Sequence, residues 1–312
     1  MIKRTALAAA LTLTAFIAGT GAAAAQAVPD WLGGELKKPL ADTRIGITVL
    51  YPGSNSYQAK YAEAAVSYAK EIGIDATVMD PQGDPATQFN QLQDMIAQKM
   101  DVIVLWPTSQ NALIPAVRQA SRANIPVVTS NSPIGEAGRQ YVTAHTGPDD
   151  CKLASQAAEM LGDSLGGKGN VVVIEGTPGY SVSILRGNCF LDDWNREKSQ
   201  RVMEAFLVKY DKIDGVYSGD DNMGVGALNA AKAAGRADKI AFVGATNFAV
   251  GYEAMERGEY YGSIYQSPVD DAKNALKTAI AVVKGEKVPA LNYFETPKIT
   301  KANMKDFTKP VF

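Results

Sequence analysis

The sequence predicts an α/β protein made of two doubly wound parallel-sheet lobes, and three observations support this prediction. Short apolar runs without alternation, such as Val102 to Leu105, are typical of strands buried on both faces of a parallel sheet. Between these runs, apolar residues such as Phe89, Leu92 and Ile96 recur at helical spacing. The pattern occurs twice along 312 residues, a length that suits two domains of about 150 residues each.

The first series contains predicted strands at 45–50, 74–79, 102–106 and 126–129. Their first residues are 29, 28 and 24 positions apart, the length of one strand and one helix joined by short loops. The second series begins near Tyr141. It has a helix at 149–165, strands at 170–175, 213–218, 240–244 and 260–265, a helix at 268–284 and an extended piece at 291–295.

One interval of the second series is irregular. From residue 171 to residue 213 the strand starts are 42 positions apart, too long for one unit and too short for two. Two helices are expected there, at 180–191 and 194–209, on one side of the sheet and with no strand between them to return the chain. The second lobe is therefore expected to lack one strand-containing segment, an inner strand whose loss would leave unpaired backbone groups.

The first residues resemble a secretory signal. Lys3 and Arg4 precede an apolar run to about Ile17, and small residues continue to Ala27, as in a cleaved signal peptide. Cleavage predicts an exported, soluble protein. Removing two basic residues leaves 29 against 33 acidic ones, a net charge of -4. In an oxidising compartment Cys151 and Cys189 are expected to form a disulfide, with two separate buried thiols as the alternative.

Composition argues against several classes of function. A net charge of -2 and a pI of about 5.6 lack the basic surface that nucleic-acid binding needs. The sequence has a single histidine, His145, which argues against histidine-based zinc sites and a Ser-His-Asp triad because both need imidazole groups at defined positions. His145 is itself expected in a hinge or capping loop. The sequence thus predicts neither an enzyme nor a cofactor or metal site.

Two glycine-rich stretches partly resemble glycine-rich nucleotide-binding motifs. Gly162 to Gly169 comes close to the P-loop pattern, but Gly169 lacks the hydroxyl that binds Mg²⁺ and the segment follows a helix instead of opening one. We expect a helix C-terminal turn there. Gly224 and Gly226 lie within a predicted helix and indicate close helix packing.

Polar and aromatic residues follow the predicted strands at their carboxyl ends, where open α/β sheets bind ligands. The candidates in the first lobe are Tyr51, Ser54, Ser56, Tyr57, Trp106 and Asn131. Those in the second are Arg186, Trp194, Asp220, Thr246, Asn247 and Gln266. Such a mixture suits a small polyhydroxylated solute, because planar polar groups pair with hydroxyls and aromatic faces cover C–H groups. Asp220 and Asp221 could instead cap the helix that follows.

From about Arg44 to the C-terminus the sequence resembles type I periplasmic solute-binding proteins of the ribose-binding kind, the receptors of sugar ABC importers. The resemblance rests on six segments: 45–57, Leu105-Trp106-Pro107-Thr108, 125–129, 166–171, 193–198, and 213–217 with 220–223. It implies two lobes joined by three crossovers, near 145–148, 266–268 and 295–297, with the ligand between them. The expected domains are a signal peptide at 1–27, an extension at 28–42, a first lobe at 43–144 plus 267–296, and a second lobe at 145–266 plus 297–312.

The resemblance also implies roles for single residues. Ser56 and Tyr57 stand where the family has an aromatic pair that sandwiches the sugar, so Tyr57 is the stacking residue, with Tyr51 nearby. Arg186, Trp194 and Gln266 match a second-lobe arginine, an aromatic residue and a hinge-side glutamine. This sequence departs from the family pattern at three places. Asn131-Ser132 stands where sugar-binding members have an Asp-Arg pair, Asp220 stands where they have an asparagine, and Thr246 stands where an aspartate is common. They indicate a modified sugar, a polyol or another small polar solute.

The expected function is the substrate-binding component of an ABC importer, a monomer that closes on its solute and docks on a membrane permease. Three alternatives stay open. A sensory receptor would present the ligand to a chemoreceptor or histidine kinase. A repressor of the lactose type would need a helix-turn-helix ahead of Arg44, where the signal peptide lies, and an exported hydrolase would need a base near a serine.

Lengthening the irregular interval tests whether a strand-containing segment is missing from the second lobe. Inserting roughly 14 to 20 residues after Phe190, enough to complete a second βα unit, is expected to raise the melting temperature because the missing strand pairs backbone groups. Thermal denaturation of both proteins measures this, and an unchanged melt would refute it.

Overall fold

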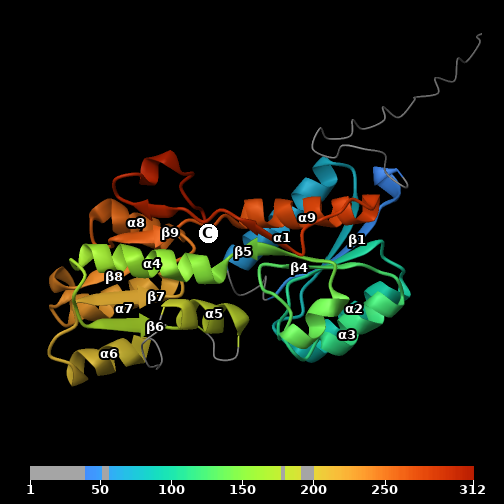
Figure 1. The fold of residues 1–312 in the computed structure, drawn as a ribbon. Coiled ribbons are helices and arrows are strands. Elements are labelled where there is room, and N and C mark those ends of the chain that lie inside the picture. The colour runs from blue at the N-terminus through green and yellow to red at the C-terminus, as the bar shows by residue number, and fades with distance from the viewer. Residues whose placement is uncertain (1–38, 51–55, 177–179, 191–199) are drawn as a thin grey trace, which may run out of the picture.

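The computed structural model describes residues 39–50, 56–176, 180–190 and 200–312 (Figure 1). These residues form two α/β lobes that lie side by side, each built around its own sheet. The predicted signal peptide at 1–27 and three candidate residues, Tyr51, Ser54 and Trp194, lie outside the described residues. None of the described helices is long and apolar enough to cross a membrane.

The first lobe contains a six-stranded parallel sheet in the order β10-β5-β4-β3-β1-β2. Its strands are β1 (Arg44–Thr48), β2 (Asp75–Met79), β3 (Val102–Leu105), β4 (Val127–Ser130), β5 (Ala144–Pro148) and β10 (Leu291–Phe294). Its helices are α1 (Ser56–Glu71), α2 (Pro85–Ala97), α3 (Ile114–Arg122) and α9 (Pro268–Lys284), with two 3-10 turns, η2 (Leu40–Asp42) and η3 (Glu136–Tyr141).

Strand β3 shows why its sequence is apolar throughout. Val102 and Val104 pack with α1 and α9 on one face of the sheet, whereas Ile103 and Leu105 pack with α2 and α3 on the other. All four side chains are at most 1% exposed. A strand covered on both faces has no solvent-facing positions, so the polar alternation of a half-exposed strand is absent.

The second lobe contains a five-stranded sheet in the order β11-β9-β8-β7-β6, parallel except for β11. Its strands are β6 (Val171–Ile174), β7 (Gly215–Ser218), β8 (Ala241–Val243), β9 (Gly262–Ile264) and β11 (Lys298–Thr300). Its helices are α4 (Asp150–Ser164), α5 (Ser181–Phe190), α6 (Gln200–Lys209), α7 (Asp221–Ala233) and α8 (Ala249–Arg257), with η4 (Ala237–Lys239) and η5 (Met304–Asp306).

The irregular interval has a different structure from the one that the sequence analysis expected. Helix α5 packs against α4, and α6 packs against α7. Because the α4 and α7 cores lie on opposite faces of the second sheet, α5 and α6 also cover opposite faces. The expectation that both lie on one side of the sheet was wrong.

The second sheet also shows where a strand is missing. The first sheet continues past its first strand, β1, to β2, whereas the second sheet ends at its own first strand, β6, among the described residues. The missing strand therefore belongs to the edge and not to the interior, and β6 to β9 remain a continuous ladder. An edge strand can be lost at lower cost, because water can hydrogen-bond the backbone groups that it leaves.

The chain passes between the lobes three times, and one boundary differs from the expected one. Strand β5 pairs with β4 and β10 in the first sheet. The first crossover therefore follows Pro148, whereas the sequence placed the boundary after Ala144. The other two run from β9 to α9 through Gln266 and from β10 to β11 through Thr296.

His145 lies within β5 and not in a hinge or capping loop, which corrects that expectation. It is 5% exposed, its Nδ1 lies 3.1 Å from the Thr129 hydroxyl, and its ring meets Tyr293 edge-on. Burial lowers the pKa of His145 to about 4. The imidazole is therefore a neutral core group at physiological pH.

Both glycine-rich stretches have the structural roles predicted for them. Helix α4 ends at Ser164, and Gly166 and Gly167 follow with φ of 63° and 78°, the left-handed conformation of a helix C-terminal turn. Gly224 lies in α7, where a Cβ atom would collide with the Tyr260 and Ser218 side chains. The glycine allows α7 to approach the sheet closely.

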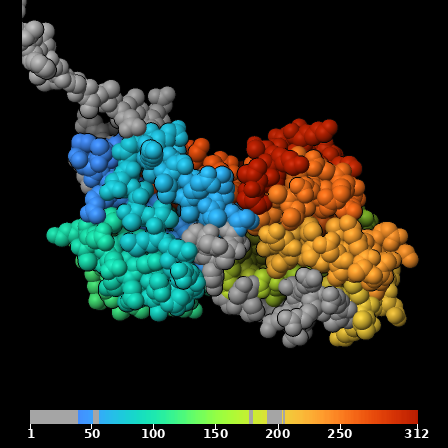
Figure 2. Space-filling view, turned by 180° about the vertical axis from the view of Figure 1, so that it is seen from behind, coloured from blue at the N-terminus to red at the C-terminus, as the bar shows by residue number. Residues whose placement is uncertain are grey.

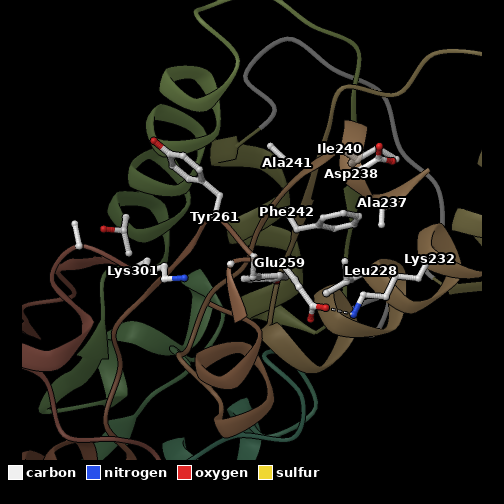
Figure 3. Close-up of a pocket in the computed structure, with 14 residues that line it drawn as sticks. Leu228, Lys232, Ala237, Asp238, Ile240, Ala241, Phe242, Glu259, Tyr261 and Lys301 are labelled. Carbon is white, nitrogen blue, oxygen red and sulfur yellow. Dashed lines mark hydrogen bonds and ion pairs between the residues drawn. The ribbon is translucent and has the colours of Figure 1, made fainter. Parts of the chain in front are cut away.

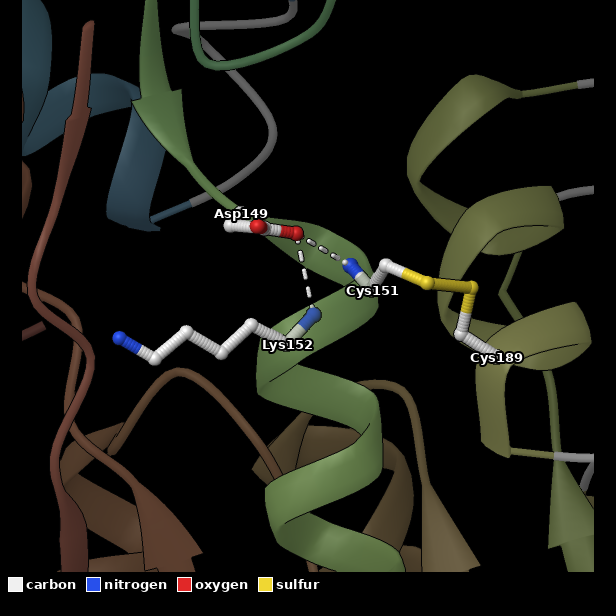
Figure 4. The surroundings of a disulfide bond; sticks show 4 residues. All are labelled: Asp149, Cys151, Lys152 and Cys189. Carbon is white, nitrogen blue, oxygen red and sulfur yellow. Dashed lines mark hydrogen bonds between the residues drawn. A yellow bond between two sulfur atoms is a disulfide. The ribbon is translucent and has the colours of Figure 1, made fainter.

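Cys151 and Cys189 form a disulfide that joins the first turn of α4 to the last turn of α5 (Figure 4). Their Cα atoms are 5.1 Å apart. Asp149 caps the same end of α4 by accepting hydrogen bonds from the backbone N–H groups of Cys151 and Lys152. The disulfide thus fixes the packing of α4 against α5, the helix that precedes the irregular interval.

Figure 2 shows the molecule from behind, with the two lobes as distinct masses that meet along a junction. The last residues lie over the second lobe on the side of this junction. The C-terminus is labelled between the lobes in Figure 1.

Removing the disulfide is expected to destabilise the second lobe. The two cysteines are 38 residues apart, and closing a loop of that length in the unfolded chain corresponds to about 4 kcal/mol. Urea denaturation of a Cys151→Ser/Cys189→Ser variant, beside the oxidised and the reduced parent, measures the loss. Equal midpoints for the variant and the oxidised parent would contradict the expectation.

Candidate interlobe binding site

The carboxyl ends of the parallel strands carry polar side chains that meet across the junction of the lobes. Tyr180, just ahead of α5, accepts a hydrogen bond from Trp106 Nε1 at 2.9 Å. The Tyr180 hydroxyl also lies 2.9 Å from the Ser132 hydroxyl. Trp106 follows β3 and Ser132 follows β4, so the first lobe contacts the second at the sheet edge where open α/β proteins bind ligands.

Arg186 of α5 is the central group on the second-lobe side. Its Nε donates to Asp150 Oδ1 at 2.8 Å, and the two side chains are 6% and 2% exposed. Nη1 donates to the Gly219 carbonyl at 2.8 Å and to the Thr246 hydroxyl at 3.2 Å, and Nη2 donates to Gln266 Oε1 at 3.1 Å. Burial disfavours the cation and is the largest single effect, but the charge and hydrogen bond of Asp150, together with Tyr217 and Tyr57, outweigh it, so the pKa of Arg186 lies above its usual value.

Gln266 extends these hydrogen bonds into the first lobe. Its Nε2 donates to the Tyr57 hydroxyl at 2.8 Å, and this hydroxyl donates to Asp271 Oδ2 at 3.0 Å. Asn131 Nδ2 donates to the same oxygen at 2.6 Å. A continuous chain of hydrogen bonds therefore crosses the hinge. We call it the interlobe network, and its members are Asp150, Arg186, Thr246, Gln266, Tyr57, Asp271 and Asn131.

Aromatic rings surround the Tyr57 side chain. Trp106, Phe248 and Phe312 meet its ring edge-on, with centroids 6.0, 6.4 and 5.6 Å away. Phe248 belongs to the second lobe, yet it packs in the same hydrophobic cluster as the β1 and α1 residues of the first. The Phe312 carbonyl accepts a hydrogen bond from Ala249 N at 2.9 Å. The polar network is thus flanked by an aromatic cluster that also spans both lobes.

Three residues at this edge have left-handed backbone conformations. Asn131 follows β4 with φ of 60°, and Thr246 and Asn247 follow β8 with φ of 83° and 54°. Asparagine tolerates this region, but a β-branched threonine rarely adopts it. The strain at Thr246 accompanies the hydrogen bond that its hydroxyl accepts from Arg186. Strained backbone of this kind concentrates at functional sites.

Two adjacent aspartates at the start of α7 have different roles. Asp220 caps the helix by accepting a hydrogen bond from Met223 N at 2.8 Å, as its alternative interpretation predicted. Asp221 is buried, and it accepts hydrogen bonds from the Ser263 hydroxyl and from Phe248 N at 2.9 Å. Asp221 therefore holds the loop that carries Thr246. Burial raises the pKa of Asp220, and the hydrogen bond from Met223 N and the charge of Arg186 oppose this rise.

A family profile described as "Periplasmic binding protein domain" matches residues 45–287. This chain belongs to the periplasmic binding protein family. It is 30% identical over 278 residues to the xylitol-binding protein of Mycolicibacterium smegmatis, covering 84% of this chain and 78% of that one. It is 27% identical over 252 residues to the ribose import binding protein RbsB of Escherichia coli, covering 76% of this chain and 84% of that one.

A solved structure shares the fold of this periplasmic binding protein. The ABC transporter periplasmic solute-binding protein of Actinobacillus succinogenes, with bound D-allose, superposes with a TM-score of 0.78 at 24% identity, over 85% of this chain and all of that one. The predicted fold of two α/β lobes is thus confirmed.

The interlobe network contains five of the residues that the sequence singled out: Tyr57, Asn131, Arg186, Thr246 and Gln266. Trp106 contacts Tyr57, and Asp220 lies at the neighbouring helix cap. That these groups contact a ligand remains a prediction.

Sequence reasoning missed Asp150, Asp271, Tyr180, Phe248 and Phe312. Asp150 and Asp271 resemble ordinary acidic residues in a first helical turn, so only their burial distinguishes them. No sequence pattern marks Phe312 as a site residue, because it reaches the site only where the last segment of the chain folds back to the junction of the lobes.

A cavity of about 710 Å³ lies elsewhere in the second lobe (Figure 3). It is lined by residues at the amino ends of β8 and β9 and beyond β11, among them Phe242, Tyr261 and Lys301. The ion pair of Lys232 with Glu259 lies at its rim. This is the sheet edge opposite the interlobe network, so the cavity takes no part in the site described above.

Replacing Arg186 is expected to lower the free energy of unfolding of the protein. An Arg186→Met variant leaves Asp150 buried without its counterion, which destabilises by about 3–5 kcal/mol. The matched control is Arg139→Met, because Arg139 forms an ion pair with Glu136 in which both side chains are more than half exposed and which contributes at most about 1 kcal/mol. Urea denaturation compares the two, and equal losses would contradict the central role of Arg186.

Proposed function

We propose that this protein is the periplasmic substrate-binding component of an ABC importer, which captures a sugar or polyol between its lobes and delivers it to a membrane permease. The observation that carries the proposal is the interlobe network. Its members come from the strand ends and helices of both lobes and from the crossover at Gln266, so a solute bound among them would contact both lobes at once.

The chemistry of the network suits a polyhydroxylated solute. The Arg186 guanidinium and the Asn131 and Gln266 amides are planar donors, and the carboxylate of Asp271 is an acceptor. The aromatic rings around Tyr57 offer apolar faces for the C–H groups of a sugar or polyol. Similarity to proteins named for xylitol and ribose supports the same class of ligand.

Closure follows from the three crossovers. Each lobe has its own core, and the chain between them is short, so the lobes can rotate as rigid bodies about the crossovers. A solute that pairs with groups of both lobes binds the closed form more tightly than the open one and thereby shifts the population towards it. The permease would then recognise the closed form.

The proposal includes export and processing. Cleavage after Ala27 would release a soluble mature protein with a net charge of -4, from 29 basic and 33 acidic residues. The protein would act as a monomer without catalysis and without nucleic acid. The disulfide between Cys151 and Cys189 fits an oxidising compartment.

Thermal denaturation with a ligand panel tests the binding function. The mature protein from Val28 onward is melted with pentoses, hexoses and polyols. A ligand at about 100 times its Kd adds about 2.7 kcal/mol, a shift of several degrees. We expect a selective shift with one member or a few related ones, absent from the Arg186→Met variant. A cooperative melt that no member shifts would contradict the sugar or polyol assignment.

A further inference from the structure

One atom of the interlobe network has no hydrogen-bond partner among the described residues. Asp271 is 0% exposed, and its Oδ2 receives the hydrogen bonds of Tyr57 and Asn131. Its Oδ1 is buried without a hydrogen bond from any described residue. Buried carboxylate oxygens are almost always hydrogen-bonded, so an orphaned one at a ligand site indicates an acceptor that a bound molecule satisfies.

The position of Asp271 favours contact with a solute over a purely structural role. It lies in the first turn of α9, directly after the crossover that carries Gln266. Its two partners, Tyr57 and Asn131, follow β1 and β4 at the carboxyl edge of the sheet. The free oxygen therefore belongs to a carboxylate held between two side chains of the proposed site.

The charges at the site are unbalanced among the described residues. Arg186 is the only cation of the network, and Asp150 neutralises it at 2.8 Å. No described lysine or arginine forms an ion pair with Asp271, and the Asp220 carboxylate is likewise without one. A buried carboxylate is stable as an anion only when a cation or several donors accompany it. The missing charge must come from the ligand, or else the carboxyl group holds a proton.

We propose that Asp271 is a specificity-determining residue of the interlobe site, and that it selects a solute carrying an ammonium group, an amino sugar or an aminated polyol. The ammonium donates to Oδ1 and balances the charge, while ring or chain hydroxyls pair with the neighbouring amides. The inference rests on the proposed function and specifies its substrate class.

The titration of Asp271 supports this assignment. Burial raises its pKa to about 7, with Asp150 and Asp270 adding to the rise and the donors Asn131 and Tyr57 opposing it. The other titratable groups around it are Tyr57 and Tyr61 of α1, whose pKa values are raised by burial and by Asp271. Near neutral pH the carboxyl group is thus divided between its two forms, and a bound ammonium favours the anion.

Matched pairs of solutes test the proposal by isothermal titration calorimetry. The probes are D-glucosamine with D-glucose, D-galactosamine with D-galactose, and 1-amino-1-deoxy-D-sorbitol with D-sorbitol. We expect an amino member to bind at least about tenfold more tightly than its hydroxyl partner at pH 7.5. Hydroxyl members that bind equally well or better would overturn the amine preference and leave the sugar-binding function standing. Binding by none of the six would count against both.

Two variants separate charge from shape. Asp271→Asn keeps the size of the side chain and removes its charge, so the preference for the amine is expected to fall to less than about threefold. Asp270→Asn is the matched control, because Asp270 is the exposed neighbour in the same helical turn. An unchanged preference in Asp271→Asn would overturn the assignment.

The pH profile of the parent protein provides a test that does not depend on the folding of a variant. Below its pKa the Asp271 carboxyl group binds a proton and loses its attraction for an ammonium. A single coupled proton with a pKa of about 7 predicts that affinity for an aminated polyol is about tenfold lower at pH 6 than at pH 8. Affinity for a neutral polyol is expected to vary less. A flat profile for the amine would contradict the proposal.

Discussion

The buried ion pair between Arg186 and Asp150 is the interaction on which the junction of the lobes depends. The guanidinium donates to the carboxylate, to a threonine hydroxyl, to a backbone carbonyl and to the hinge glutamine. An arginine can do this because its planar fork presents donors in fixed directions and its charge survives burial. Asp150 stands at the start of α4, immediately after the first crossover, so the pair fixes α5 to the hinge as well as to its own lobe.

The second lobe is an abbreviated version of the first. In the first lobe α1 packs against α9, and α2 against α3; in the second α5 packs against α4, and α6 against α7. Among the residues that the structure describes, no strand corresponds to β2, but β2 lies at the edge of its sheet, so the remaining strands keep their neighbours. The disulfide between α4 and α5 constrains the helix that a β2-like strand would otherwise follow. The shortened lobe therefore retains the strand ends that carry the site.

The site combines polar complementarity with local strain. Asn131 and Thr246 follow corresponding inner strands, β4 and β8, and both have left-handed backbone. Each directs its side chain into the interlobe network, one to Asp271 and the other to Arg186. The two sheets thus contribute equivalent positions to one network, as expected where ligands bind at the carboxyl edge of parallel strands.

The sequence by itself determined the fold class, most strand positions and five members of the network. Apolar runs and their spacing report local burial, and residues after parallel strands must share one edge. Helix α9 has the predicted bounds, Pro268–Lys284, because a capping serine and a terminal glycine enclose it. Only the tertiary structure decided that α5 and α6 cover opposite faces, that His145 is a core residue, and that Asp150, Asp271 and Phe312 reach the site. These outcomes depend on contacts between residues distant in sequence, such as Asn131 with Asp271, and no local pattern encodes such contacts.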